Sequence, residues 1–306
     1  MFSSSAVTAA EYFCPAKINL CLAVTGRRPD GYHDLVSVVA PVDFGDTLRV
    51  APATRFSLSC DDPSLPADDS NLVMKAAMAF RTATGWDGGA SFVLTKRIPI
   101  GAGLGGGSSD AAGALRALNA LAGEPLTRSG LEKVAAGVGS DCALFLAGGP
   151  VIMRGRGENV APMLGTRLGG MKVLIFKPAF AISTPWAYTR LAALATGIGR
   201  APVVGAYFSA AVAETAVAKV VEAATVGGNL GGLLFNSLEL PAFEKFAALP
   251  TLLCRLREKF GLAPRMSGSG SACFALLPQG APVTEIGAVI RDAWGESAWI
   301  VASTLS

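Results

Sequence analysis

The hydrophobic positions in the first half of the chain follow the two-residue period of strands in some segments and a helical period in others. Strands are expected at residues 17–24, 35–50, 56–60 and 90–100. Helices are expected at residues 70–85, from Ser108 to Gly123, and at 126–139. Ser70 is the expected N-cap of the first helix, which Gly85 closes. Strands and helices that mix without strict alternation favour an α+β fold.

The pattern changes near residue 160, where APMLGTRLGG has the composition of connecting chain. We therefore expect two domains, residues 1–160 and 161–306. In the second domain, strands are expected at 171–178 and 298–303, and helices at 186–194, 205–225, 241–260 and 284–294. The long helix at 205–225 is mostly apolar, but three charged residues interrupt it, which predicts a surface helix and no membrane span.

Composition and charge exclude several classes of protein. Hydrophobic residues make up 51% and charged residues 16% of the 306 residues, which suits a compact fold and disfavours disorder. The net charge of +3 comes without a run of basic residues, so nucleic acids and membranes are not expected as partners. The N-terminus shows no secretory signal, and the six scattered cysteines form no CxxC pair. These features predict a reduced, cytoplasmic protein without structural zinc or disulfides.

Residues 101–112, GAGLGGGSSDAA, connect an expected strand to an expected helix. Bare backbone followed by a helix N-terminus is typical of a phosphate site, and the two serines could cap the helix or reach a phosphate or its Mg²⁺. Glycines that merely permit a tight chain crossing are the alternative. The GxGxxG of dinucleotide-dependent oxidoreductases also matches, but that motif needs an acidic residue at a strand end, and Glu124 follows a helix. The Walker A pattern is absent.

Several separated segments, in the same order along the chain, resemble the GHMP kinases. They are AKINL, RRPDGYHDL, GAGLGGGSSDAA preceded by Pro99, GSDCALFL, GRGE and MSGSGSACFAL, between residues 14 and 276. The resemblance implies a two-domain fold, with a left-handed β-α-β crossover in a β-rich N-terminal domain and a ferredoxin-like C-terminal domain. It also implies phosphoryl transfer from ATP, accompanied by Mg²⁺, to a hydroxyl group of a small molecule.

The resemblance assigns the chemistry to Lys17 and Asp141. Asp141 would accept the proton of the acceptor hydroxyl, and Lys17 would orient it and offset charge on the phosphoryl oxygens. Without the resemblance, a solvated strand lysine and a turn aspartate would be the expected roles of this pair. The residues expected to bind ATP are Pro99, Gly101, Gly103, Leu104, Gly105, Gly106, Gly107, Ser108 and Ser109, with Asn71 on the adenosine side.

On the substrate side, the resemblance implies that Asn19, Tyr32 and His33 hold a cytidine group. Taken alone, the Tyr32–His33 pair would be an ordinary pair of loop residues. Tyr188 is the expected second aromatic wall, with Trp186 as the alternative. A second backbone cradle is expected at Gly268, Ser269 and Gly270, which a simple bend would also explain. The pair favours a cytidylylated methylerythritol, phosphorylated on its 2-hydroxyl, over homoserine or mevalonate as the acceptor.

Three features depart from the family pattern or stay open. Cys142-Ala143 follow Asp141, where the family usually has a proline and an aromatic residue. FNSLE at 235–239 replaces the commoner Asn-Asp-Leu-Glu, which leaves the role of that loop open. No carboxylate beyond Asp141 stands out as a metal ligand. Since both Lys17 and Asp141 are present, a non-catalytic relative is disfavoured, and we expect a monomer or a weak homodimer.

Overall fold

The computed structural model describes residues 9–197, 203 and 205–306. Residues 1–8, which begin the segment where no secretory signal is expected, lie outside the described residues. The chain forms two compact units, each built from several segments. The first comprises Met1–Ala16, Phe44–Pro99 and Gly105–Gly148, and the second Lys17–Asp43, Ile100–Leu104 and Gly149–Ser306. The long strands β1 (Ala10–Arg27) and β2 (His33–Ala53) contribute residues to both units. A single division near residue 160 stays a prediction.

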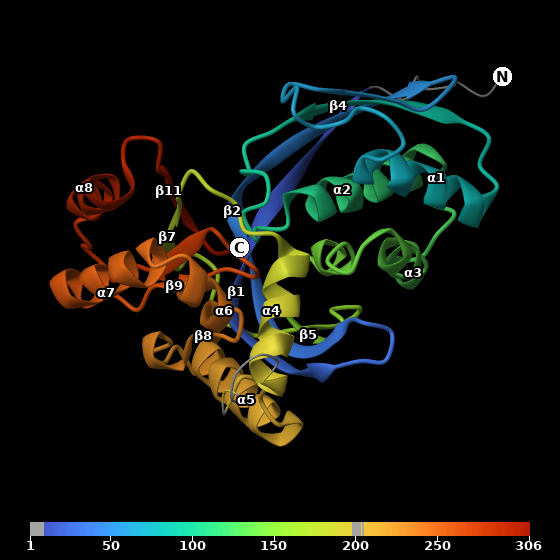
Figure 1. The fold of residues 1–306 in the computed structure, drawn as a ribbon. Helices are drawn as coiled ribbons and strands as arrows, with labels where there is room; N and C mark the ends of the chain where they lie inside the picture. Colours follow the sequence, from blue (N-terminus) through green and yellow to red (C-terminus); the bar gives the residue numbers. More distant parts are fainter. Residues whose placement is uncertain (1–8, 198–202, 204) are drawn as a thin grey trace. The chain divides into compact units, whose positions relative to one another are not determined.

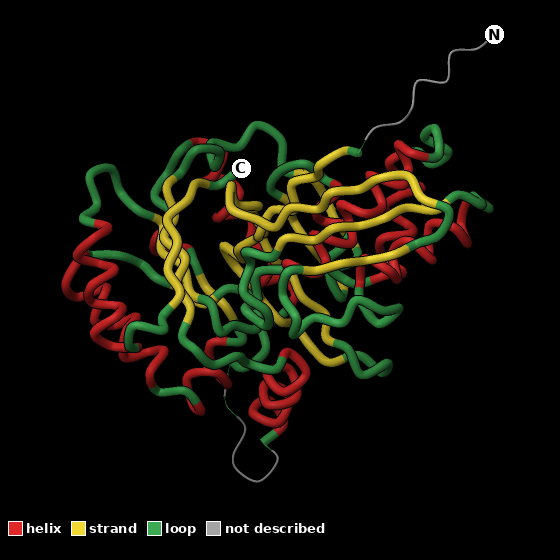
Figure 2. Tube along the Cα trace, turned by 90° about the horizontal axis from the view of Figure 1, so that it is seen from above, coloured by secondary structure: helices red, strands yellow, loops and turns green. Residues whose placement is uncertain are grey.

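In the first unit, strands cover a layer of helices. The strands are the second part of β2, β3 (Ser57–Cys60) and β4 (Gly89–Thr95), and the helices are α1 (Leu72–Thr84), α2 (Gly106–Leu121), α3 (Arg128–Val138) and the short 3₁₀ helix η1 (Ala143–Leu146). β3 runs parallel to β4, and β2 runs antiparallel to it with Thr47 opposite Thr95. Figures 1 and 2 show the three α-helices packed together on one face of these strands. The largest fully buried side chains of this unit include Phe80, Phe92, Leu94, Leu115 and Leu118.

The second unit contains an antiparallel sheet of four strands. These are β7 (Lys172–Lys177), β9 (Arg265–Met266), β10 (Cys273–Leu276) and β11 (Trp299–Thr304), in the order β11-β7-β10-β9. Helices separate the first strand from the second and the third from the fourth, which makes this the ferredoxin-like arrangement expected from the resemblance. The helices are α4 (Thr184–Thr196), α5 (Ala210–Val226), α6 (Glu239–Lys245), α7 (Ala248–Phe260) and α8 (Val283–Trp294). Residues of β7, β10, α4, α6, α7 and α8 share one hydrophobic core.

Smaller pairings complete the second unit. The two-residue strand β8 (Phe235–Asn236) pairs parallel to β1 and follows the short 3₁₀ helix η2 (Gly231–Leu233). The first part of β2 pairs with β5 (Val151–Gly155), which pairs in turn with β6 (Asn159–Pro162). Within the described chain, none of the helices is both long and apolar enough to cross a bilayer.

Several details differ from the expectations, and the helix expected at 205–225, for example, begins only at Ala210. The N-cap of α1 is Asn71 and not Ser70, because the Asn71 side chain accepts the Val73 N–H whereas the Ser70 hydroxyl bonds to Asp68. Helix α2 begins two residues before Ser108, at Gly106.

Two further differences are the end of a strand and a break within a helix. The strand expected to reach residue 100 ends at Thr95, because carboxylates bind the next backbone N–H groups: Asp61 accepts that of Lys96, and the buried Asp46 accepts those of Arg97 and Ile98. The helix expected at 241–260 is two helices, since the backbone leaves the helical conformation at Phe246.

Candidate active site

Lys17 and Asn19 lie on one face of β1, as the alternation of a strand requires. Both are buried, with 4% and 5% of their surface exposed, so Lys17 is not a solvated strand lysine. Lys17 Nζ donates a hydrogen bond of 2.7 Å to Asn19 Oδ1, and Asn19 Nδ2 donates one of 2.9 Å to Ser37 Oγ. The Ser37 hydroxyl donates to the Cys21 carbonyl. This chain of buried hydrogen bonds fixes the orientation of the lysine and the asparagine.

Gly103 packs directly against the loop that contains Gly268, Ser269 and Gly270. A Cβ atom at Gly103 would lie 2.2 Å from the Ser267 carbonyl oxygen, and the residue has a φ of +76°. The Ser267 hydroxyl donates to the Gly103 carbonyl, which ties the two loops together. At this position the glycine therefore serves a close approach of two chain segments, which was the alternative to a phosphate role.

The FNSLE segment supports the same small-residue loop. Asn236 Nδ2 donates hydrogen bonds of 2.8 Å to the carbonyls of Met266 and Gly268. Glu239 Oε1 accepts the Met266 N–H, and burial raises the pKa of the Glu239 carboxyl. The segment whose role the sequence left open is thus an anchor for the loop that faces Gly103.

His33 is buried and lies against two aromatic rings of its own unit. Its ring centroid is 5.1 Å from that of Tyr188 and 6.0 Å from that of Tyr207. Tyr32 is 53% exposed, with Arg156 of the GRGE motif over its ring. Burial, followed by the charge of Arg27, lowers the pKa of His33, so the imidazole is neutral at physiological pH.

Trp186 and Tyr188 point to different neighbours. Trp186 packs edge-on against Phe246, with Lys245 over its ring. Tyr188 lies beside His33, one turn of α4 away from the start of the helix. The structure therefore brings Tyr188, and not Trp186, together with His33.

The first unit holds the rest of the glycine-rich loop, at the N-terminus of α2. Gly105 is the N-cap, with a φ of +76° and a carbonyl that accepts the Ser109 N–H at 2.9 Å. No side chain caps this helix, so the N–H groups of its first turn are open to an acceptor from outside the helix. The buried hydroxyl of Ser109 has no hydrogen-bond partner among the described residues. This N-terminus has the backbone donors and the dipole direction of a phosphate site.

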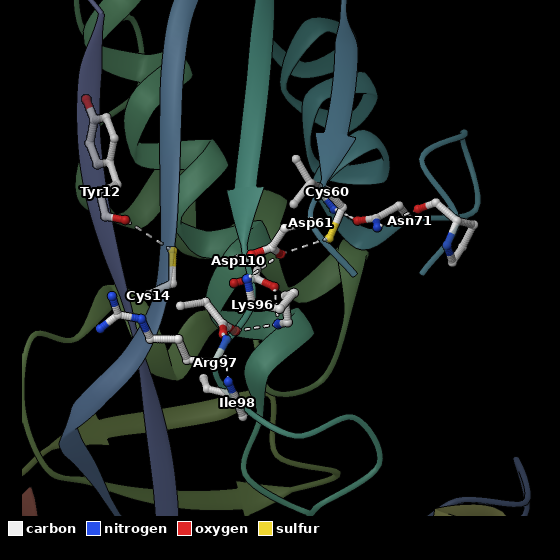
Figure 3. A network of polar contacts seen from close by, with 12 residues as sticks. Tyr12, Cys14, Cys60, Asp61, Asn71, Lys96, Arg97, Ile98 and Asp110 are labelled. Carbon is white, nitrogen blue, oxygen red and sulfur yellow. Dashed lines mark hydrogen bonds and ion pairs between the residues drawn. The ribbon is translucent and has the colours of Figure 1, made fainter. Parts of the chain in front are cut away.

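A buried network of charges connects the end of β4 to the same helix (Figure 3). Asp46 is fully buried, and its carboxylate accepts hydrogen bonds from the backbone N–H groups of Arg97 and Ile98 and from Lys96 Nζ. Lys96 Nζ also donates a hydrogen bond of 2.8 Å to Asp110 Oδ2 on α2. Burial would lower the pKa of Lys96, but the charges of the two carboxylates outweigh it and raise the pKa. The lysine stays protonated and links the segments on either side of the loop within this unit.

Asp110 is the member of this network whose carboxyl is least well compensated. Burial raises the pKa of its carboxyl, Lys96 opposes that shift, and the charge of Asp46 adds to it. Asp110 Oδ1 has no hydrogen-bond partner among the described residues. A carboxyl with a raised pKa holds its proton more readily, and protonation of Asp110 removes one buried negative charge from the network.

Asp141 lies in the turn before η1, in the same unit as α2. Its neighbour Cys142 is buried, and burial raises the pKa of the thiol to about 12, with a hydrogen bond from Ser108 opposing the shift and Asp141 adding to it. Cys142 and Ser108 thus connect the Asp141 turn to the first turn of α2. The cysteine fills the place of the family's usual proline without removing the carboxylate.

No group of three or more His, Cys, Asp or Glu residues in the part of the chain that the structure describes could hold a metal ion. Asn71, expected on the adenosine side, caps α1 and donates to the Pro66 carbonyl.

The residues of these sites that the sequence analysis did not assign include Asp46, Lys96, Tyr207 and Asn236. Lys96 could have been noticed, since it lies five residues before the glycine-rich loop. The other three come close to the sites only through the fold, because each lies many residues away from its partner in the chain.

Comparison with known proteins identifies the relatives of the chain. Residues 71–149 match the family model of the GHMP kinases N terminal domain, and residues 210–296 match the GHMP kinases C terminal model. A 4-diphosphocytidyl-2-C-methyl-D-erythritol kinase from Synechococcus sp. (strain CC9902) is 40% identical over 86% of this chain and 85% of its own length. One from Gloeobacter violaceus is 38% identical over 90% of this chain and 88% of its own.

Solved structures agree with these matches. A crystal structure of a 4-(cytidine 5'-diphospho)-2C-methyl-D-erythritol kinase superposes with a TM-score of 0.76 at 35% identity, covering 97% of this chain and 99% of the other. A homoserine kinase from Cytophaga hutchinsonii gives the same TM-score of 0.76 at 19% identity, over 100% of this chain and 97% of its own. At that identity the second match shows a shared fold alone.

Proposed function

The chain belongs to the 4-diphosphocytidyl-2-C-methyl-D-erythritol kinases of the GHMP kinase family, and from this premise we propose how its residues carry out the reaction. It is an ATP-dependent kinase, and the acceptor is the 2-hydroxyl of 4-diphosphocytidyl-2-C-methyl-D-erythritol. The observation that carries the assignment of a cytidylyl site is the ring pair of His33 and Tyr188. An imidazole beside an aromatic ring suits a flat base, which homoserine and mevalonate lack.

The chemical step needs a proton acceptor and compensation of charge. The hydroxyl oxygen of the substrate forms a bond to the γ-phosphorus, while the bond from that phosphorus to the bridging oxygen breaks and ADP leaves. Asp141 takes the hydroxyl proton. Lys17, buried and held by Asn19, offsets negative charge on the phosphoryl oxygens, because bulk water screens the charge of a buried ammonium only weakly.

The open N–H groups at the start of α2 support phosphate binding by Gly105, Gly106 and Gly107. The hydroxyls of Ser108 and Ser109 lie in the same turn and suit a phosphate oxygen or its Mg²⁺. When bound, Mg²⁺ supplies neutralisation of phosphate charge. The remaining loop positions, Pro99, Gly101, Gly103 and Leu104, are proposed to shape the loop, and Asn71 to approach the adenosine.

Substrate contacts are proposed on the second unit. Tyr32 is exposed, and Tyr188 lies beside the buried His33, so both are proposed to contact the base. Gly268, Ser269 and Gly270 form a small-residue turn whose backbone is anchored by Asn236. The location in the cytoplasm and the state as a monomer or weak homodimer stay predictions.

The first experiment is a coupled assay of ADP release from Mg-ATP with the cytidylylated substrate. Asp141→Asn is expected to lower kcat about 10²- to 10⁴-fold, because the amide cannot accept the proton. Asp87→Asn, which changes an exposed aspartate of the same unit, is the matched control and is expected to retain full activity.

Other outcomes would change the assignment. A wild-type protein that is inactive on this substrate but phosphorylates homoserine or mevalonate would remove the cytidine role of Tyr32 and His33. An Asp141→Asn variant that retains its kcat, with a wild-type protein that is active, would assign the proton to another acceptor.

A further inference from the structure

Tyr207 makes a side-chain contact that the proposed function does not use. Its hydroxyl oxygen lies 3.1 Å from Nε2 of His33, within hydrogen-bond distance. The two rings are tilted by 59°. Tyr207 lies three residues before the start of α5, far from His33 in sequence and in the same unit.

We infer that Tyr207 is a positioning residue of the pyrimidine site: its hydroxyl donates to Nε2 of His33 and thereby keeps the ring proton on Nδ1. The inference rests on the proposed function, because it takes His33 as a contact of the substrate's base. It goes beyond it by assigning the protonation of the ring and the residue that sets it.

The direction of the hydrogen bond follows from the chemistry of the two groups. Burial lowers the pKa of His33 and raises the pKa of Tyr207, so the imidazole is neutral and the phenol keeps its proton. A phenol O–H is a stronger acid than an imidazole N–H, and an imidazole lone pair is a stronger base than a phenol oxygen. The bond from the hydroxyl to the ring is therefore the favoured one, and the other ring nitrogen carries the proton.

The charged groups around the ring agree with a neutral imidazole. Arg27 on β1 lowers the pKa of His33, and Asp34, its neighbour on β2, raises it. Tyr188 on α4 and Tyr207 contribute aromatic rings from the other elements that contact His33. Burial, the largest effect, and Arg27 together outweigh the single carboxylate.

A fixed donor on Nδ1 selects between bases. Cytosine presents two neighbouring acceptors, N3 and O2, whereas N3 of uracil carries a proton and donates. O2 accepts in both bases, so the discriminating contact is the one to N3. A His33 ring that is free to change tautomer could serve N3 of either base, and one that Tyr207 holds as a donor toward N3 favours cytosine. Tyr207 thus acts on specificity through His33, without touching the substrate itself.

His33 is the only histidine of the chain, so its ring can be observed without assignment. Nitrogen-15 spectra of the ligand-free full chain at neutral pH are expected to show the proton on Nδ1. In Tyr207→Phe, which keeps the ring and removes the hydroxyl, the proton is expected to move toward Nε2. The pKa of His33 is expected to rise, because a hydrogen bond to the neutral form is lost. Tyr12→Phe removes a hydroxyl from the other unit and is expected to change neither result.

Kinetics give the second readout. Tyr207→Phe is expected to raise the KM for the cytidylylated substrate about 3- to 10-fold, the size of one hydrogen bond, and to leave kcat and the KM for ATP unchanged. Discrimination between CMP and UMP, measured from the shift of the His33 signals, is expected to fall by the same factor. Equal thermal unfolding of the variant and the wild type confirms that the fold is intact.

Two results would overturn the inference directly. They are a wild-type ring with its proton on Nε2, and a Tyr207→Phe spectrum equal to that of the wild type. His33 signals that do not respond to CMP would instead overturn the pyrimidine site, and with it the positioning role. Because the tautomer is read without a ligand, the failure of the hydrogen bond and the failure of the proposed function are distinguishable.

Discussion

At Gly103 the space beside the α-carbon is filled by the backbone of another loop. The Ser267 carbonyl oxygen would lie 2.2 Å from an added Cβ, and the Gly270 nitrogen 2.9 Å from it. Both neighbours are backbone atoms, which cannot rotate away as the end of a flexible side chain does. The residue also has a φ of +76°, where a side chain costs about 1–2 kcal/mol by itself.

Gly103→Ala is therefore expected to destabilise the protein by about 2 kcal/mol or more, and to weaken the hydrogen bond between Ser267 and the Gly103 carbonyl. Urea unfolding measures the change. Gly232→Ala is the matched control, since Gly232 has no neighbour within 4 Å of its added Cβ and a backbone that alanine accepts. Equal stabilities of the two variants would contradict the packing seen at Gly103.

At the scale of elements, one lysine holds the end of β4 and helix α2 in the first unit. Lys96 bonds to Asp46 of β2 and to Asp110 of α2. Asp46 accepts two of the backbone N–H groups beyond β4, those of Arg97 and Ile98, so the strand ends and the chain turns into the loop. Removal of one partner from such a buried pair costs about 3–5 kcal/mol, because the remaining charge is left without compensation.

The protonation of Asp110 gives this network a pH dependence. Its pKa is raised in the folded protein by burial and by Asp46, so the folded state holds a proton that the unfolded state loses above about pH 4. The stability from this proton is complete below that pH and is lost as the pH rises through the raised pKa. Asp110→Asn removes this titration. From pH 5 to pH 8, the unfolding free energy of the wild type is therefore expected to fall relative to that of the variant.

Urea unfolding at several pH values tests this expectation, with Asp87→Asn as the control for an exposed carboxylate. The control is expected to follow the wild-type curve. Parallel curves for the wild type and Asp110→Asn would contradict a raised pKa at Asp110.

At the scale of the whole molecule, the local patterns of the chain predicted most elements and few of their partners. The helices near 72–84 and 283–294 and the strand near 299–304 were expected within about two residues, because their periodicity and caps are local signals. Elements of the second unit without such signals were not assigned. Examples are the short strands β5, which pairs with β2, and β6, which pairs with β5.

The candidate sites divide in the same way. Motif residues such as Lys17 and His33 carry signals in their own segments, and both are buried among polar or aromatic partners. Tyr207 lies in no motif, and the role of Asn236 in the FNSLE segment stayed open, because their hydrogen bonds to His33 and to the 266–268 segment span 30 or more residues. Such contacts depend on the tertiary fold, which local sequence patterns do not contain.

The six cysteines report on the packing of the whole molecule. All six are free thiols, of which Cys254 is exposed, Cys60 is half-buried and the remaining four are buried. Burial raises the pKa of Cys21 to about 12 and that of Cys273 well above its ordinary value, so the buried thiols lack the thiolate that reacts with disulfide reagents. A thiol-reactive disulfide dye at pH 8 is therefore expected to react quickly with one thiol, slowly with a second, and with all six only in urea. Cys254→Ser should remove the fast phase, and fast reaction of more than two thiols in the native protein would contradict the packing of both units.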